Sequence, residues 1–319
     1  MNIFHAIIQG IVQGLTEFLP VSSSGHLAIS QHIFGMGESN LFFNVMLHVG
    51  TLAAVAAFYR RLIKRLFRAF LRMLGDIVMG RYKWNKMDEE ENLVIMLVIG
   101  LVPLFLLFVP LPFSGGMNAK ELAEIWSGKS GYMVVVGASL LMTSALLTLG
   151  IFANKMTEVS YKERGIVRKK GAGRHYMNVI DSLSVGIAQT FAAVFPGLSR
   201  SGSTLAVGEL RGINKQRALD YTFVLGIPSI VAAAVLEGKE ALKSGKFTLG
   251  MIFPTIVGVI VSAIVGFFAI CLFKWMLRKD RMHIFAIYTA VVGVIVIIIG
   301  TVELNTGVNI FTGKPLVFI

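Results

Sequence analysis

Hydrophobic runs long enough to cross a bilayer recur along this sequence, separated by shorter polar and basic segments. The runs lie at about 41–59, 93–112, 132–154, 219–236, 249–273 and 285–303. Roughly 20 apolar residues in a helix span the roughly 30 Å hydrocarbon core of a membrane. The pattern therefore predicts an all-α integral membrane protein with six transmembrane helices.

Two other apolar segments, 3–35 and 178–208, carry polar residues in their centres and are copies of one another at a constant offset. The coinciding residues include Gly10 and Gly186, Gln13 and Gln189, Pro20 and Pro196, and Ser23 and Ser199. Proline breaks a helix because it lacks an N–H and clashes with the preceding turn, and serine is a preferred N-cap for a following helix. We therefore expect each segment to form a re-entrant helical hairpin, with its irregular turn buried in protein or lining a wet cavity.

Basic residues are distributed unevenly among the connecting segments. Lys and Arg number nine in 60–92, seven in 155–177, three in 209–217 and four in 274–283, against two in 113–131 and three in 237–248. Loops rich in Lys and Arg stay on the cytoplasmic side. We therefore expect the first four segments to be cytoplasmic.

This orientation implies an inverted repeat. Span 41–59 would run inward, whereas its copy 219–236 would run outward. We expect repeat 1 at about 1–154 and repeat 2 at about 178–303, within a single polytopic membrane domain covering 1–319. The hairpins would then enter from opposite faces and meet near the midplane, where broken helices of inverted repeats commonly bind ligands.

Composition agrees with a membrane protein, because 55% of the 319 residues are hydrophobic and 15% are charged. The net charge of +12 is spread over loops, which favours membrane orientation over a nucleic-acid partner. Cys271 is the only cysteine, so neither an intramolecular disulfide nor a thiol pair for a metal is expected. The first 20 residues lack a basic start and a cleavage site, so we expect them to belong to the working protein.

The second helix of each hairpin predicts an anion site. A helix start presents unpaired N–H groups and a partial positive charge, and small residues there let phosphate oxygens approach the backbone. The candidate phosphate-binding residues are Ser22, Ser24, Gly25, Ser199, Ser201, Gly202 and Thr204. Arg200 adds a planar charged fork suited to phosphate, although a purely structural pair with Glu17 is an alternative.

The first hairpin holds the candidate acid–base groups. Gln9, Gln13 and Glu17 share one helix face at intervals of four residues. Glu17 could bind a divalent cation or orient water as a base, or it could be protonated and inert. His26, beside the serine cluster, is a candidate general acid or base, whereas a packing role is expected for Gln9 and for His48.

The motif QGLTEFLPVSSSGH together with PGLSRSGST resembles the undecaprenyl pyrophosphate phosphatase family, the bacitracin-resistance membrane phosphatases. The family's Glu/Gln-x-x-x-Glu motif corresponds to Gln13 and Glu17, and its Pro-Gly-x-Ser-Arg-Ser-Gly motif to Pro196 through Gly202. Gln13 stands where some relatives have Glu, which removes a charge from a candidate metal ligand.

The resemblance implies hydrolysis of undecaprenyl diphosphate to undecaprenyl phosphate and inorganic phosphate, a phosphoric anhydride cleavage that recycles the lipid carrier for peptidoglycan. It also implies a divalent cation, Mg²⁺ or Ca²⁺, held by Glu17 and Gln13. The site would open to the outer face of a bacterial cell membrane, and bacitracin resistance would follow because the drug sequesters the diphosphate.

As a hypothesis, Arg200 and the cation neutralise the diphosphate, and Ser23 or a water polarised by Glu17 attacks the terminal phosphorus. His26 would handle the proton. The alternative is a lipid-phosphate carrier, or flippase, built on the same inverted repeat, because a carrier also needs anion-binding groups. A homodimer is left open.

Overall fold

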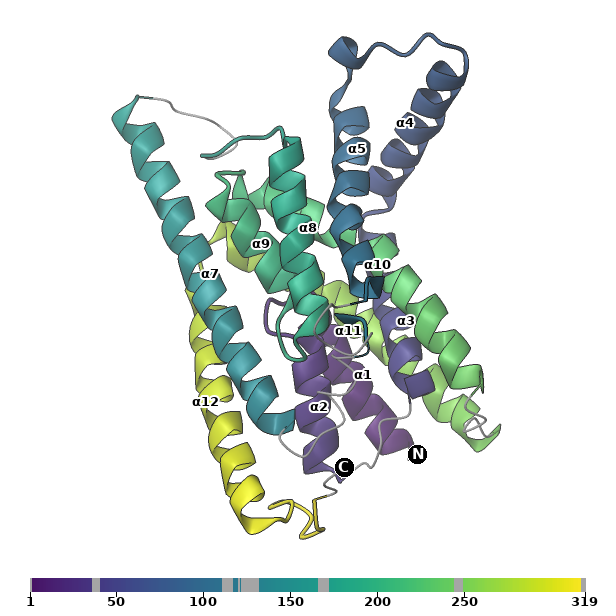
Figure 1. Ribbon diagram of the computed structural model, residues 1–319, viewed down its shortest axis with the longest axis vertical. Helices are drawn as coiled ribbons and strands as arrows, with labels where there is room; N and C mark the ends of the chain where they lie inside the picture. The colour runs from purple at the N-terminus through teal and green to yellow at the C-terminus, as the bar shows by residue number, and fades with distance from the viewer. Residues whose placement is uncertain are drawn as a thin grey trace.

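Helices make up the regular structure of the protein in a computed structural model (Figure 1), with only isolated β-bridges besides. The model describes residues 2–35, 41–110, 117–119, 121, 132–165, 172–243 and 249–316. The predicted all-α class is therefore confirmed for this part of the chain. The two segments with fewer Lys and Arg are only partly described: most of 113–131, and residues 244–248 of 237–248, lie outside the described residues.

Six helical stretches correspond to the predicted spans. They are α3 (Leu41–Phe58), α5 (Glu89–Leu101) with the 3-10 helix η2 (Val102–Phe108), α7 (Tyr132–Glu163), α10 (Lys215–Lys243), α11 (Ile252–Arg278) and α12 (His283–Thr306). Five are long and apolar enough to cross a membrane, and a sixth is added when α3 and the helix after it count as one bent span. The chain is therefore a multi-pass membrane protein.

The segment 60–92, expected only as a basic loop, contains a helix that the prediction missed. This helix, α4 (Arg60–Val78), follows α3 after an 82° bend and is joined to α5 through the 3-10 helix η1 (Trp84–Lys86). Its Leu66, Ala69 and Met73 are buried. Their spacing of three and four residues is that of one helix face, which the many charges obscured when the segment was judged by hydropathy.

The two copied segments fold as two matched pairs of helices. In the first, α1 (Ile3–Phe18) precedes α2 (Ser23–Ile33); in the second, α8 (Val179–Val194) precedes α9 (Arg200–Leu210). The first helices have 16 residues each and the second helices 11 each. The α1–α2 pair lies toward the end of the molecule that carries the N-terminus, and α8–α9 lies toward the opposite end (Figure 1).

Glycines on α1 allow this helix to pack closely against the long helix α11. A Cβ atom on Gly10 would lie 2.8 Å from the carbonyl oxygen of Gly258, and one on Gly14 would lie 2.8 Å from that of Ser262. Such close approach is typical of helix packing in membranes. It fixes α1 against α11 and so fixes the position of the turn that follows α1.

Candidate functional site

The turns of the two helix pairs are in contact at the centre of the molecule. A Cβ atom on Gly25 would lie 3.1 Å from Cα of Gly197. The N–H of Gly197 donates to Ser24 Oγ at 3.4 Å, and Ser201 Oγ donates to the carbonyl of Leu19 at 3.2 Å. Gly197 has φ of +93°, a conformation that favours glycine. The convergence of the two turns expected from the sequence is therefore present.

Serine caps the start of the second helix in each pair, as expected. Ser22 Oγ accepts from the N–H of Gly25 at 3.2 Å, and Ser199 Oγ accepts from the N–H of Gly202 at 3.0 Å. Ser22 has φ of +75°, an unfavourable conformation for a residue with a side chain, of the kind found at ligand sites. The positive ends of α2 and α9 therefore lie together.

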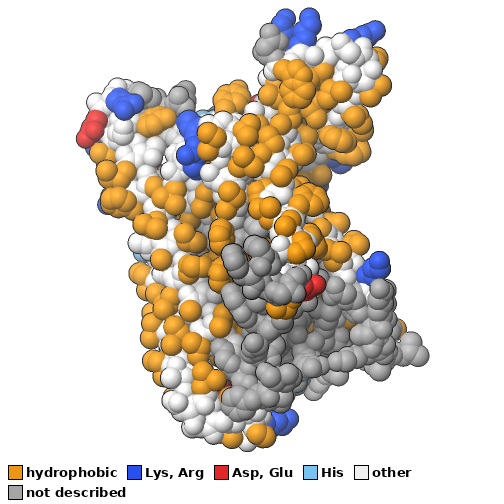
Figure 2. Space-filling view, in the orientation of Figure 1, with side chains coloured by type: hydrophobic (Ala, Val, Ile, Leu, Met, Phe, Trp, Pro, Cys, Tyr) orange, Lys and Arg blue, Asp and Glu red, His pale blue; other side chains and the backbone are white. Residues whose placement is uncertain are grey.

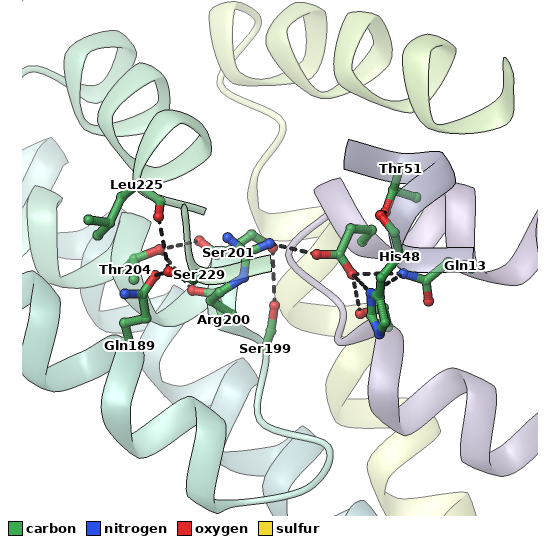
Figure 3. Close-up of polar contacts among 12 residues, drawn as sticks. Gln13, His48, Thr51, Gln189, Ser199, Arg200, Ser201, Thr204, Leu225 and Ser229 are labelled. Carbon is green, nitrogen blue, oxygen red and sulfur yellow. Dashed lines mark hydrogen bonds and ion pairs between the residues drawn. The ribbon is translucent and has the colours of Figure 1, made fainter. Parts of the chain in front are cut away.

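Glu17 and Arg200 join the two pairs of helices (Figure 3). Arg200 Nη2 donates to Glu17 Oε1 at 2.6 Å. The other carboxylate oxygen, Oε2, accepts from Ser23 Oγ at 2.7 Å and from Gln13 Nε2 at 3.0 Å. The side chain of Glu17 is only 5% exposed, whereas that of Arg200 is 21% exposed. The Arg200 guanidinium thus pairs with the Glu17 carboxylate, and part of the Arg200 side chain stays solvent-accessible.

The guanidinium of Arg200 packs directly against Gly226 on α10. A Cβ atom on Gly226 would overlap Nη1 of Arg200. Only glycine leaves enough space at this position, so Gly226 helps to determine the position of the Arg200 guanidinium.

His48 belongs to the site, although the sequence suggested a packing role. Its Nδ1 atom lies 3.4 Å from Glu17 Oε2 and 2.7 Å from Gln13 Nε2. The repeat offered one overlooked signal, since Val224 replaces His48 in the second copy just as Ala193 replaces Glu17. Functional groups present in one copy only are expected where the two copies have divided the chemistry.

His26 is positioned differently from the expectation. Its Nδ1 atom lies 2.8 Å from the carbonyl oxygen of Ser22, and its Nε2 lies 2.8 Å from the hydroxyl of Tyr288 on α12. The two rings stack with centroids 5.6 Å apart. Thr204 also points back into its own helix, where its hydroxyl donates to the carbonyl of Arg200 at 2.8 Å. Neither residue lines the two cavities at the turns.

The first of these cavities is polar and has a volume of about 70 Å³. Its lining comes from both turns and consists of Thr16, Glu17, Ser22, Ser23, Ser24, Ala192, Leu198, Ser199, Arg200 and Ser201. Five of the predicted phosphate-binding or catalytic serines are therefore grouped around one small space with the Glu17–Arg200 pair.

A second cavity, of about 550 Å³, shares Glu17, Ser23 and Arg200 with the first and also contains His48. Its remaining walls are mostly apolar side chains of α3, α5 with η2, and α10, including Val45, Phe108 and Leu236. Gln189, the α8 copy of Gln13, also lines it and accepts from Ser229 Oγ at 3.2 Å. A polar end with an apolar body suits an amphipathic ligand.

The oxygen atoms around Glu17 fit a hard cation only if the ligand supplies further oxygens. Within the described residues no group of three or more His, Cys, Asp and Glu side chains could hold a metal ion. Gln13 Oε1 is buried without a hydrogen-bond partner, whereas Nε2 of the same side chain donates to Glu17 Oε2 at 3.0 Å. Mg²⁺ is commonly bound by one or two protein oxygens plus phosphate oxygens, which Glu17, Gln13 and Ser23 can provide in part.

The sequence of this chain matches a known protein family. The model of a family described as bacitracin resistance protein BacA matches residues 6–295. The chain belongs to the BacA family. The BacA match includes all but the first three residues of the two pairs of short helices, and every candidate residue from Gln13 to Thr204.

Relatives of this BacA-family chain carry the name undecaprenyl-diphosphatase. One from Alkaliphilus metalliredigens is 36% identical over 302 residues, which are 93% of this chain and 98% of that protein. One from Bacteroides fragilis is 35% identical over 95% of this chain and 100% of its own length. One from Methanobrevibacter smithii is 36% identical over 93% of this chain and 97% of its own length.

Proposed function

We propose that this BacA-family protein hydrolyses undecaprenyl diphosphate to undecaprenyl phosphate and inorganic phosphate. The observation that carries the proposal is the Glu17–Arg200 pair, which joins the last turn of α1 to the first turn of α9 at the polar end of an apolar cavity. Membership of the BacA family and the name shared by its relatives support the same activity. The product returns the lipid carrier to peptidoglycan synthesis, and removing the diphosphate form confers bacitracin resistance.

The diphosphate would lie in the polar cavity and the prenyl chain along the apolar walls. Arg200 and the first turns of α2 and α9 place positive charge at the phosphate oxygens. Phosphoryl transfer depends mainly on positioning and charge stabilisation. The small volume of the polar cavity restricts it to the head of the lipid.

We propose Ser23 as the nucleophile, a role supported by its hydroxyl, which donates to Glu17 Oε2 at 2.7 Å. An alcohol hydrogen-bonded to a carboxylate base is the arrangement that activates such a group. Attack of Oγ on the terminal phosphorus would release undecaprenyl phosphate and leave a phosphoserine, which water would then hydrolyse. In the alternative, Glu17 orients a water that attacks the same phosphorus directly.

Either route needs a group that takes up and returns a proton. His48 lies 3.4 Å from Glu17 and is better placed for this than His26. We therefore assign the imidazole role in the reaction to His48, and a structural role against α12 to His26.

A divalent cation, Mg²⁺ or Ca²⁺, would be held by Glu17 and by Gln13 Oε1. It would supply charge neutralisation for the diphosphate oxygens. With a single carboxylate at the turns, the diphosphate oxygens would have to supply the remaining ligands of such a cation.

The membrane arrangement is proposed on the same residues. Matching helix lengths and opposite placement of α1–α2 and α8–α9 support two re-entrant hairpins in an inverted repeat, within one domain covering 1–319. The large cavity reaches Val45, near the start of α3, whereas the basic segment 60–92 follows the other end of that helix. With that segment in the cytoplasm of a bacterial cell, the site opens to the extracytoplasmic face of the cell membrane.

A flippase is the less favoured alternative, because carrying a lipid phosphate does not require an acid hydrogen-bonded to a serine. A homodimer stays a prediction.

Phosphate release by the purified protein in detergent tests the proposal. The substrate is undecaprenyl diphosphate with Mg²⁺ or Ca²⁺ present, and detergent removes any contribution from transport. We expect Glu17→Ala and Arg200→Ala to abolish release. Asp220→Asn is the matched control, because Asp220 pairs with Lys274 at 2.7 Å and lines neither cavity. Failure of the unmodified protein to release phosphate would refute the proposal.

A further inference from the structure

The exposed surface of α4 is divided into an apolar and a basic part. Figure 2 shows hydrophobic side chains over the projection formed by α4 and α5, with Lys and Arg at its tip. The apolar stripe consists of Phe67, Phe70, Leu71, Leu74, Ile77 and Val78, which are between 39% and 79% exposed. These positions are separated by three and four residues, so they form one continuous face.

The basic stripe lies directly beside the apolar stripe. It consists of Arg60, Arg61, Lys64 and Arg68, all exposed. Among the described residues none of the four forms an ion pair, whereas Arg65 pairs with Glu90 and Arg72 with Asp88 and Glu91. The third face of α4, with Leu66, Ala69 and Met73, is buried against the core that includes α5.

A bilayer surface explains both stripes. Six large apolar side chains in a row are more than a water-exposed helix carries without a partner. The neighbouring α5 and η2 also carry exposed apolar side chains, including Val98, Val102 and Phe105, which lie on a predicted membrane span. A helix with one apolar and one basic face is typical of the boundary between headgroups and acyl chains.

We propose that α4 is an interfacial anchor whose apolar stripe enters the bilayer and whose basic stripe binds anionic phospholipid headgroups. A second copy of the chain is a poorer occupant. In a twofold contact between identical surfaces, the four unpaired basic side chains of each copy would face those of the other. Anionic headgroups complement the same charges, and each Lys or Arg near such a surface strengthens binding.

The test places a polarity-sensitive fluorophore on the apolar stripe of the full-length protein. Cys271, the only cysteine, is replaced by serine, and Leu71→Cys is labelled with nitrobenzoxadiazole. Lys83→Cys, on the exposed connection between α4 and α5, is the matched control. Each protein is placed in nanodiscs of phosphatidylcholine, or of equal parts phosphatidylcholine and phosphatidylglycerol, and a water-soluble quencher is added.

We expect the label at Leu71→Cys to become blue-shifted and protected from the quencher in the anionic discs, and less so in the zwitterionic discs. The label at Lys83→Cys should stay accessible in both. Added salt should reverse part of the protection. Lys64→Gln and Arg68→Gln should each lower the partition equilibrium of the labelled stripe by roughly fivefold. Phosphate release in detergent should be unchanged, because α4 lines neither cavity.

Two results would overturn the proposal. One is equal accessibility of the label at Leu71→Cys in both kinds of disc. The other is protection that appears in detergent and grows with protein concentration, which would assign the apolar stripe to a second copy of the chain.

Discussion

Arg200 Nη2 lies 2.6 Å from Glu17 Oε1, although the two residues belong to different helix pairs and are separated by 183 positions. Each helix pair alone would hold an unpaired charge among apolar helices, which is costly. The pair therefore stabilises the contact between the turns and also presents the guanidinium to the cavity. Structure and chemistry depend on the same two side chains.

Arg200→Lys should therefore lose most of the activity although the charge is kept. A lysine cannot form the planar, two-pronged contact that Arg makes with carboxylate or phosphate. We expect kcat for phosphate release to fall about a hundredfold or more. Gel filtration of the variant checks that it is still folded. Activity within a factor of two of the unmodified protein would mean that only charge is needed at this position.

Ser23→Ala separates the two chemical routes. If Ser23 is the nucleophile, brief incubation of the unmodified protein with substrate labelled in the terminal phosphate should leave label on the protein, and Ser23→Ala should leave none. We expect the variant to lose about a thousandfold in kcat. Ser30→Ala on the same helix is the matched control, since Ser30 Oγ accepts from Gln9 Nε2 at 2.7 Å and lines neither cavity. Full activity in Ser23→Ala would assign the attack to water.

Local sequence signals were sufficient to predict where each of the two copied segments breaks into two helices. Pro20 and Pro196 break the helices, and Ser22 and Ser199 cap the next ones, because these effects act within one turn of the chain. The membrane spans were also predicted from local sequence, because the hydropathy of a segment is the sum of the contributions of its own residues. The helix α4 was not predicted, because its many charged side chains lower the mean hydropathy of the segment. Its apolar residues are recognisable only by their spacing of three and four positions.

The site was predicted less completely, because it depends on which faces of the helices meet. Closeness in sequence to Glu17 and the serines favoured His26, yet α2 directs that ring toward Tyr288. His48 is remote in sequence from Glu17, and only the packing of α1 and α3 on α11 brings it close. The mismatch between His48 and Val224 was the available clue.

His48→Asn should therefore reduce activity more than His26→Asn does. Loss of a proton-transferring side chain typically costs about a hundredfold to ten-thousandfold in rate. We expect a loss in this range for His48→Asn, together with a changed dependence of kcat on pH. His26→Asn should alter thermal stability more than it alters kcat, because its ring packs on Tyr288. The opposite ranking of the two variants would restore His26 as the catalytic imidazole.

Gly226→Ala tests whether the position of Arg200, and not only its charge, matters. The added methyl group would overlap the guanidinium, so the side chain must move away from Glu17. We expect kcat to fall roughly tenfold or more, since small displacements of positioning groups are costly. Gly238→Ala on the same helix is the control, because its added Cβ would lie 4.0 Å from the nearest heavy atom, Cγ1 of Val45, and its activity should be unchanged.

Gln13→Glu should lower the concentration of divalent cation needed for half-maximal activity. The substitution adds a second carboxylate beside Glu17, where Gln13 now presents a buried amide oxygen without a hydrogen-bond partner. Hard cations bind more tightly as the number of charged oxygen ligands rises. Phosphate release is titrated with Mg²⁺ and with Ca²⁺ after treatment with a chelator, and the half-maximal concentration should fall about tenfold for at least one of them. Gln189→Glu, at the equivalent position of α8, is the matched control, because Gln189 bonds Ser229 and should leave that concentration unchanged. An unchanged requirement in Gln13→Glu, or full activity without any divalent cation, would remove the metal from the proposed site.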